Sequence, residues 1–574
     1  MIGQMKYPPF PLIFVLVFFL IASVSIREVG LVGEVAAGWA LDSAPHVLVQ
    51  DTPELWADGA AATTAGHQIG PLVASQARPI ERLSFPMGSM PLAINMYTSG
   101  ISDWGSRLVW VMTDSLKWVM WWHLALGGIL ILLVYRFLHF HGSRVSATVA
   151  ALVLSTDWAF LFYRKVLGGT EILLQAAALL CLWSLWSRRW RGGRHGLTGF
   201  AVGVAVGISA KLTFGLTLIA LLLAALLTRW DKPQLRPPLP GKLWRPALVF
   251  AVIVCPLVWT WVHHLVWVPG LPHIQSHDFF GVQFDRVMRG GLGGSVPVRE
   301  SIENLFWWVR DPLMFFGAAY GAQTSTASAV LPVLAWLVSI LGVGVAWSDR
   351  HPTPRLALLR FCSVFLVLQT LILWWVARDL HHLASTSVTL SIVVGLSVGT
   401  LVKRFSPSHS MRHYALSMVL ALPWAMMGLD RSLRTDAVIA TIPVPTFTKK
   451  GQSELISMLR EHGVERVVAC DYELTGVLEV LAPDIHVVHG WGAASQRRSD
   501  VLPSLIRRAS GGHFLVLDAS APMIYNQTPS EGQMMALALE LGLVARKVAT
   551  LGSATALYEV SEKQSALREV HPKR

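Results

Sequence analysis

The chain has 574 residues, of which 53% are hydrophobic and 14% charged, with a formal net charge of +12 and a mean hydropathy of +0.50. Soluble domains have about a quarter of their residues charged, so this composition excludes an ordinary soluble protein and indicates an integral membrane protein. No basic stretch combines with a motif that reads nucleic acid, so we expect no nucleic-acid partner.

Long apolar runs occupy the first three quarters of the chain. A helix needs roughly 20 apolar residues to cross the hydrocarbon core, and about eleven runs meet or approach this length. The small residues that close the first run would permit cleavage as a signal peptide. The segment before this run has Lys6 as its only basic residue, which favours a retained helix. The predicted spans are 10–26, 118–138, 146–162, 169–187, 196–210, 212–228, 246–268, 327–347, 357–377, 383–402 and 413–429.

The apolar region 196–228 is too long for one straight span and has Lys211 at its centre. A lysine at mid-bilayer is costly, so we predict two helices with Lys211 in the turn between them. With the N-terminus inside, this interpretation gives all five inner loops an excess of Lys and Arg, as the positive-inside rule requires. We therefore expect a multi-pass protein of the bacterial inner (plasma) membrane, with a cytoplasmic N-terminus and a periplasmic C-terminus.

Three longer segments then face outward, at 27–117, 269–326 and the tail. The second contains "RESIENLFWWVRDP", which is typical of an amphipathic helix lying on the membrane with its aromatic residues inward. It borders a glycine-rich stretch and is either part of a lid over a lipid-like substrate or an ordinary connector. The aromatic residues are Phe306, Trp307 and Trp308.

The tail alternates short β-rich runs with helical patterns, which predicts a small, largely parallel sheet with helices on its faces. No glycine-rich phosphate loop follows a strand, so we expect a docking or lid domain rather than a second catalytic domain. The fold class is thus a polytopic α-helical membrane protein with a C-terminal soluble α/β domain. We place the transmembrane domain at 1–430 and the periplasmic α/β domain at 431–574.

Charged residues of the membrane region collect at the predicted outer turns. If the helices bundle, these turns converge on one cavity, whose cationic side chains suit an anionic headgroup such as a phosphate. The alternative is a structural role, in which the arginine and lysine side chains reach the membrane interface. The glutamate would then lie in the first turn of its helix, where the helix dipole favours a negative charge. Adjacent histidines point in different directions, so we expect no metal at His381 and His382. The charged candidates are Arg164, Lys165, Glu171, Lys211, Arg378 and His381.

Over about residues 10–430 the chain resembles the GT-C integral-membrane glycosyltransferases. It is most similar to the bacterial protein mannosyltransferase and aminoarabinose transferase type, the RgtA/B/C/D-like group. Four stretches carry the resemblance: "LSFPMGSMPLAINMYTSG", "STDWAFLFYRKVLGGTEILLQ", "GFAVGVAVGISAKLTF" and "VARDLHHLASTSVTLSIVVGL". The family usually has an Asp, often Asp-Glu, soon after its first helix. Here the candidates in that place are Glu28, Glu34 and Asp42, with Asp51 further on.

The resemblance implies transfer of a sugar from a polyprenyl-phosphate donor to a lipid, glycan or protein acceptor at the outer face of the membrane. Glu28 or Glu34 would be the catalytic base, and Glu171 would orient a substrate. Arg164, Lys165, Lys211, Arg378 and His381 would bind the lipid phosphate. No cofactor is certain, and a divalent metal is optional for such donors. The alternatives are a flippase for polyprenyl-linked glycans, a ligase that moves a whole glycan, or a non-catalytic scaffold.

Overall fold

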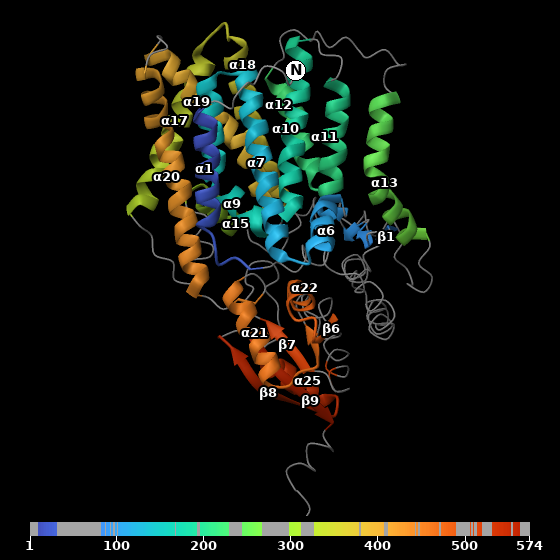
Figure 1. Ribbon diagram of the computed structural model, residues 1–574. Coiled ribbons are helices and arrows are strands. Elements are labelled where there is room, and N and C mark those ends of the chain that lie inside the picture. The colour runs from blue at the N-terminus through green and yellow to red at the C-terminus, as the bar shows by residue number, and fades with distance from the viewer. Residues whose placement is uncertain are drawn as a thin grey trace, which may run out of the picture. The chain divides into compact units, whose positions relative to one another are not determined.

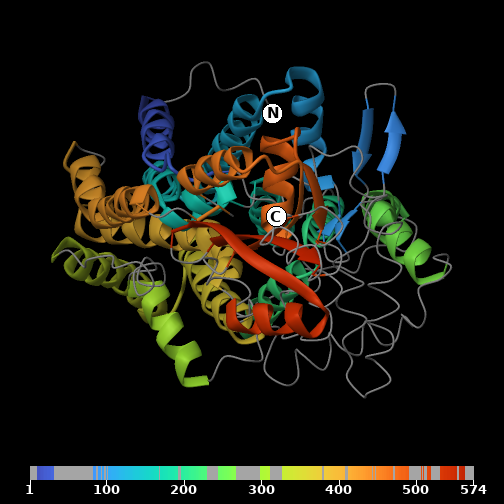
Figure 2. The same ribbon diagram turned by 90° about the horizontal axis from the view of Figure 1, so that it is seen from below.

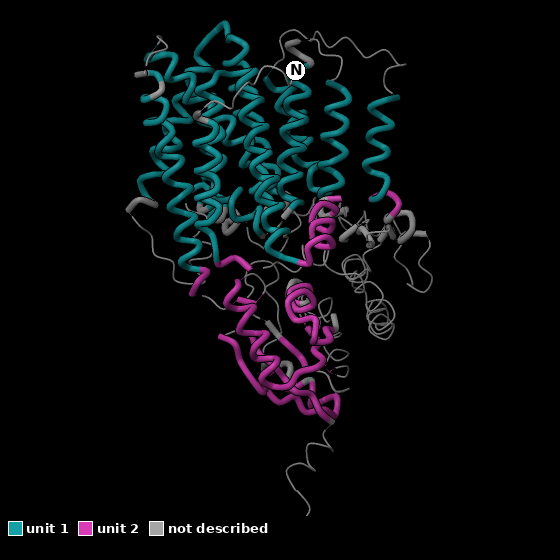
Figure 3. Tube along the Cα trace, viewed as in Figure 1, with its two compact units in different colours: residues 1–27, 115–256, 284–438 teal, residues 28–114, 257–283, 439–574 magenta. Residues whose placement is uncertain are grey.

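The computed structural model falls into two compact units (Figure 3). Unit 1 comprises Met1–Arg27, Ser115–Pro256 and Phe284–Val438, and unit 2 comprises Glu28–Asp114, Leu257–Gln283 and Ile439–Arg574. The residues described are 10–30, 82–85, 88–91, 93–95, 98–99, 101–166, 168–191, 196–228, 244–266, 298–310, 326–377, 380–406, 411–441, 444–445, 448–469, 472–489, 506, 509, 514–518, 531–552 and 555–562.

Unit 1 is a bundle of helices that run side by side (Figure 1). Each predicted span falls on a helix, except that the third falls on two and the first four residues of the tenth lie in a 3-10 helix that precedes its α-helix. Two further helices are α15 (Val298–Arg310) and the short 3-10 helix η2 (Leu380–Thr386). The span helices are α1 (Phe10–Val24), α7 (Leu116–His141), α8 (Arg144–Thr156), α9 (Trp158–Val166), α10 (Gly168–Arg191), α11 (Gly196–Ala210), α12 (Phe214–Leu227), α13 (Trp244–Val266), α17 (Thr326–Ser348), α18 (Pro354–Ala377), α19 (Ser387–Phe405) and α20 (Met411–Thr441).

Within the described part of the chain, five helices are long and apolar enough to cross a membrane, or six if the bent pair α8–α9 counts as one span. Within the described residues, four further helices contain apolar stretches shorter than 18 residues: Leu12–Val24 in α1, Gly196–Ala210 in α11, Phe214–Leu227 in α12 and Trp244–Trp259 in α13. The protein is therefore a multi-pass membrane protein.

The third predicted span, 146–162, is broken by a bend of 50° between α8 and α9. Asp157 lies at the break, and its Oδ1 accepts a hydrogen bond of 2.8 Å from the backbone N–H of Phe160. An aspartate that accepts this bond is an N-cap, which satisfies a backbone donor at the start of a helix. Asp157 therefore begins α9 as a new helix.

The structure has two helices in the region 196–228, with Lys211 between them, as predicted. A Cβ added to Gly207 would overlap the ring of Phe214, seven residues further along the chain. Seven residues of a continuous α-helix advance by about 10 Å, so the chain turns sharply between α11 and α12. The turn removes the cost of a lysine in the middle of one long span.

Helix α19 is the centre of unit 1 and packs against α8, α17 and α18. In its spanning window 94% of the residues are buried inside the protein, against 28% for α17. A Cβ at Gly395 would overlap the Ser146 carbonyl oxygen of α8, and one at Gly342 of α17 would overlap Ser397 of α19. Small residues thus bring the helix backbones together, as is common within membranes.

The described residues of unit 2 between 82 and 113 include two short antiparallel pairs, β1–β2 and β3–β4. They are followed by α6 (Ile101–Thr113), which packs against β2. The sequence pattern of 27–117 predicts none of these elements. The strands are Arg82–Phe85 (β1), Gly88–Pro91 (β2), Ala93–Asn95 (β3) and Thr98–Ser99 (β4).

The C-terminal part of unit 2, drawn in orange and red in Figure 2, contains a β-sheet. Its five strands are in the order β6-β5-β7-β9-β8. Apolar clusters lie on both of its faces, one with α21 and α22 and the other with α25, as expected. The strands are β5 (Arg466–Ala469), β6 (His486–His489), β7 (Phe514–Asp518), β8 (Leu543–Leu551) and β9 (Thr555–Glu562). The helices are α21 (Lys449–Glu461), α22 (Tyr472–Leu481) and α25 (Glu531–Glu540).

The sheet is mixed rather than largely parallel. β5 pairs in parallel with β6 and β7, whereas β9 is antiparallel to both β7 and β8. β8 and β9 are joined by only three residues, beginning with Gly552 at φ +60°. So short a connection makes a hairpin, because parallel neighbours need a crossover of about a dozen residues.

Candidate functional site

The break between α9 and α10 places three charged side chains at favourable ends of their helices. Arg164 and Lys165 lie in the last turn of α9, and Glu171 lies in the first turn of α10. A helix dipole favours cations at its C-terminus and anions at its N-terminus. This local effect explains why the charges are tolerated here, and their contacts show what each can do.

Arg164 is buried, with 2% of its surface exposed, so it does not reach out to the interface. Its guanidinium carbon lies 5.1 Å from the ring centroid of Phe19 of α1. On α7, a Cβ added to Gly127 would lie 2.9 Å from Arg164 Cδ. The imidazole of His123, also on α7, interacts electrostatically with the Arg164 guanidinium. Arg164 Nε and Nη2 are buried and have no hydrogen-bond partner among the described residues. A guanidinium held in this way can bind an anionic oxygen with two parallel hydrogen bonds.

Lys165 turns toward the segment that follows α1. Its Nζ donates to the backbone carbonyl of Ile26, which is buried. Arg164 and Lys165 therefore both contact the first helix or the residues just after it. Glu28, a candidate base, follows Ile26 by two positions in the chain.

Glu171 is buried, with 3% of its surface exposed, and Lys211 is its electrostatic partner. Gln175 Nε2 lies 3.4 Å from Glu171 Oε1 and donates a bond of 3.0 Å to the Ala384 carbonyl of η2. The structure thus brings together two predicted residues from separate turns, Glu171 and Lys211. It also adds Gln175, which tethers Glu171 to η2 and which sequence reasoning did not single out.

The remaining predicted site residues lie elsewhere or outside the described part. The Glu28 backbone carbonyl accepts a bond of 3.1 Å from the Lys449 N–H at the start of α21, within unit 2. Of His381 only the backbone is described, in η2. Glu34 and Arg378 lie outside the described residues, as does Trp307 beyond its backbone.

A second polar cluster surrounds Asp157 at the α8–α9 bend. Ser387 Oγ of α19 donates to Asp157 Oδ1 at 2.7 Å, and Arg431 of α20 attracts the carboxylate. Trp158 Nε1 donates to Thr435 Oγ1 at 2.6 Å. The sequence did carry a signal for this cluster, because Asp157 is the one acid inside the apolar run 146–162.

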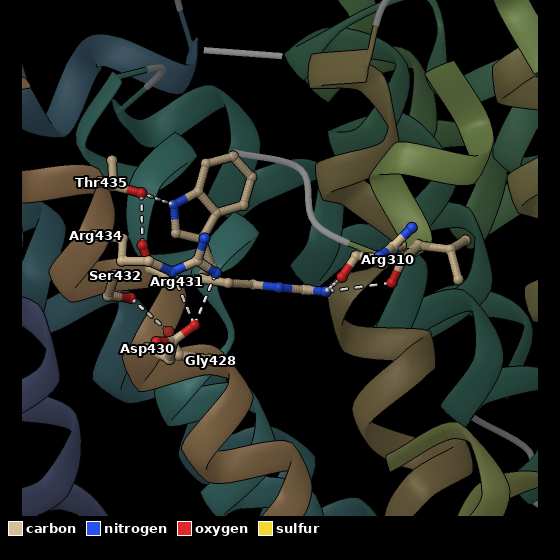
Figure 4. A network of polar contacts seen from close by, with 9 residues as sticks. Arg310, Gly428, Asp430, Arg431, Ser432, Arg434 and Thr435 are labelled. Atoms are coloured by element: carbon tan, nitrogen blue, oxygen red, sulfur yellow. Dashed lines mark hydrogen bonds and ion pairs between the residues drawn. The ribbon is translucent and has the colours of Figure 1, made fainter. Parts of the chain in front are cut away.

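Arg431 connects this cluster to α15 (Figure 4). Its Nη2 donates to the carbonyls of Val309 and Arg310, at 3.2 and 2.8 Å. These are the last carbonyls of α15, which have no partner within the helix. Trp308 packs inward on Trp158, with ring centroids 6.0 Å apart. The predicted helix over this segment is confirmed, and the Phe306 side chain is exposed on its surface.

Within the described residues, no group of three or more His, Cys, Asp or Glu side chains could hold a metal ion. The candidate site there consists of one buried acid, one buried guanidinium and two lysines. Such a set can bind an anionic group and hold a proton.

The helical bundle followed by a small α/β domain has the fold of a GT-C membrane glycosyltransferase. It is similar to ArnT from Cupriavidus metallidurans bound to undecaprenyl phosphate, with a TM-score of 0.52 and 12% identity over 95% of this chain and 97% of that chain. The apo state of the same ArnT gives a TM-score of 0.51 and 12% identity over 96% and 98%.

A weaker likeness is to the archaeal oligosaccharyltransferase AglB from Archaeoglobus fulgidus, with a TM-score of 0.40 and 12% identity over 90% of this chain and 70% of that chain. The sequence matches no protein-family model and no curated protein. The resemblance to GT-C glycosyltransferases is thus confirmed at the level of the fold.

Proposed function

We propose that the protein transfers a sugar from a polyprenyl-phosphate donor to an acceptor hydroxyl at the outer face of the bacterial inner membrane. One observation carries the proposal: the buried guanidinium of Arg164 has two nitrogens free of partners among the described residues. The fold adds support, because the similar ArnT structure was obtained with undecaprenyl phosphate bound. An isoprenoid phosphate offers the anionic oxygens that such a guanidinium binds.

In the proposed reaction, the acceptor oxygen attacks the anomeric carbon of the donor sugar. The bond from that carbon to the phosphate oxygen breaks, and the electron pair leaves with the polyprenyl phosphate. A carboxylate takes the proton of the acceptor hydroxyl. Attack from the side opposite the leaving group inverts the anomeric centre.

The cationic residues have the task of stabilising charge on the leaving phosphate. Arg164 and Lys211 are the principal candidates, with Lys165, Arg378 and His381 as additional ones. Donors placed where charge develops contribute more inside a water-poor site than in solution. Glu28 or Glu34 is the proposed base, and Glu171 keeps Lys211 in position while orienting a substrate.

The test uses purified full-length protein with a panel of labelled polyprenyl-phosphate sugars. We expect release of free polyprenyl phosphate from one donor when membrane extract supplies the acceptor. Glu28→Gln and Glu34→Gln, each alone, identify the base, because one of them should lower kcat by about 100-fold or more. Arg164→Gln should raise KM for the donor and lower kcat.

Two outcomes would contradict the proposal. Full activity of both glutamine variants would remove Glu28 and Glu34 from catalysis. Transport of an intact labelled lipid across vesicles, without cleavage of the sugar–phosphate bond, would instead establish a flippase.

A further inference from the structure

A second group of basic side chains lies at the other end of unit 1, where α7 ends and α8 begins. His123, next to Arg164, and His139, near the end of α7, are 16 residues apart on one helix, or about 24 Å. The segments 136–146, 349–360 and 401–406 contain seven Arg or Lys residues and a single acid, Asp349. This end is therefore strongly cationic and separate from the candidate active site.

Arg355, in the first turn of α18, is the centre of this group. Its Nε and Nη2 are buried and have no hydrogen-bond partner among the described residues. The neighbouring Arg360 is different, because its Nε donates to the Ala346 carbonyl at 2.8 Å and so completes the end of α17. Buried polar groups in proteins are nearly always hydrogen-bonded. The two nitrogens of Arg355 thus call for an acceptor that the described chain does not supply.

The Arg355 guanidinium lies over Gly399 of α19, together with the hydroxyl of Ser146 of α8. A Cβ at Gly399 would overlap both Arg355 Nη2 and Ser146 Oγ. Three helices therefore bring two polar groups into one small space that only a glycine leaves open. His139 Nδ1, at the same end, is also buried without a described partner, and His139 feels the charge of Arg144.

Apolar side chains around this end indicate where an acceptor would come from. Phe140, Trp347 and Phe405 are 44%, 50% and 72% exposed, and each lies within three residues of a charged or imidazole side chain of the group. Exposed aromatic residues beside basic ones are typical of the level of the lipid headgroups. Basic pockets between transmembrane helices bind anionic headgroups there.

We propose that Arg355, with Ser146 and the surrounding basic side chains, binds the phosphodiester of an anionic phospholipid. The planar guanidinium donates two hydrogen bonds to the phosphate oxygens, and the acyl chains lie along the exposed apolar side chains. The lipid completes the contact of α8, α18 and α19 at this end. The site is distinct from the proposed donor site, which lies at the opposite end of α7.

The experiment compares full-length protein in nanodiscs of phosphatidylcholine and of phosphatidylcholine mixed with phosphatidylglycerol. Native mass spectrometry measures how much phosphatidylglycerol stays bound after release from the mixed discs. We expect the wild type to retain it above its share of the bilayer. Arg355→Gln should lower this enrichment about tenfold, as expected for loss of charge-assisted hydrogen bonds. Arg466→Gln removes the same charge from an exposed position at the start of β5, outside the basic group, and should keep the enrichment.

Further arms distinguish the lipid from a free anion and guard against misfolding. Inorganic phosphate added to phosphatidylcholine discs should not raise the unfolding temperature as phosphatidylglycerol does, and an equal rise would overturn the lipid assignment. Equal enrichment in wild type and Arg355→Gln would overturn the site. If Arg355→Gln does not fold, a photoreactive phosphatidylglycerol is crosslinked to the wild type, and the crosslinked residues test the site. Crosslinks in 136–146, 349–360 or 399–406 support the proposal, and crosslinks only elsewhere contradict it.

Discussion

The ring of Phe19 covers the guanidinium of Arg164, with 5.1 Å between the guanidinium carbon and the ring centroid. The aromatic face shields one side of the cation, while Nε and Nη2 remain without described partners. An aromatic face attracts a cation without using its N–H donors, so these donors stay available for a ligand. The first helix therefore contributes to the candidate site through a side chain without any chemistry of its own.

Phe19→Leu should weaken donor binding by removing this support. A desolvated cation–aromatic contact contributes about 2 kcal/mol, so we expect KM for the donor to rise by roughly 30-fold with a smaller change in kcat. Phe14→Leu is the matched control, because Phe14 lies on the same helix and is 45% exposed. Equal effects of the two substitutions would show that Phe19 acts only through the packing of α1.

The pair Glu171–Lys211 should respond asymmetrically to substitution. Lys211→Met leaves the buried carboxylate of Glu171 without its cation, whereas Glu171→Gln leaves a half-buried lysine. An uncompensated buried charge costs about 3–5 kcal/mol, so Lys211→Met should lower the free energy of unfolding more than Glu171→Gln does. The double variant should recover part of this loss. Denaturation in detergent measures all three, and strict additivity of the two effects would exclude a direct interaction.

Asp157→Ala should destabilise the α8–α9 bend. Loss of an N-cap costs about 1–2 kcal/mol, and the Ser387 hydroxyl loses its acceptor as well. Asp157→Asn keeps an acceptor oxygen and should retain most of the stability. Thermal unfolding of the purified variants gives the order, and an asparagine variant as unstable as the alanine variant would point to the charge instead of the cap.

Gly428→Ala tests the close approach of α20 to α8. A Cβ there would overlap the carbonyl oxygen of Thr156, so the helices must move apart, at a cost of about 1–3 kcal/mol. Gly344→Ala on α17 is the control, because an added Cβ has nothing within 4 Å there. That control should be neutral or slightly stabilising, since alanine favours helix over glycine by about 1 kcal/mol.

The exposed pair Arg460–Asp484 in unit 2 predicts a pH dependence. Hydrogen bonds from the Arg460 guanidinium, at 2.8 and 3.0 Å, lower the pKa of Asp484 from its ordinary value. The stabilisation of the folded state by the ionised Asp484 is therefore complete above the unfolded pKa of about 3.9. This stabilisation is lost as the pH falls through the lower pKa that Asp484 has in the folded state. Unfolding temperatures of wild type and Asp484→Asn should converge on acidification. A difference unchanged between pH 7 and pH 3 would contradict this.

Apolar run length was sufficient to place the helices of unit 1, because a helix in lipid satisfies its own backbone hydrogen bonds. Lys211 was informative for the same reason, since its cost at mid-bilayer required a turn. The bend at Asp157 was missed because a single acid among apolar residues leaves the mean hydropathy of the run 146–162 high enough for one span. In the tail, strand positions followed from the pattern, but the direction of β9 depended on a three-residue connection.

For the candidate site, sequence reasoning identified the charged residues but not their partners. Arg164 and Glu171 are neighbours in the chain, yet the structure pairs Glu171 with Lys211 and sets Arg164 against Phe19 and His123. These contacts arise from the packing of α1, α7 and the α11–α12 turn. No local pattern carries that information, and Gln175 became a candidate only when η2 was seen to lie beside it.

The more apolar of two membrane helices, α17, should tolerate substitution better than α19, because α19 is almost completely buried inside the protein. Helix α17 is the more apolar of the two, but most of its surface faces away from the protein, so it should accept many exchanges among Leu, Ile, Val and Phe. Helix α19 contains Ser, Thr and Gly at its contacts and has almost no outer face. In a library of single substitutions at every position, α19, the less apolar of these two helices, should therefore tolerate the fewest substitutions.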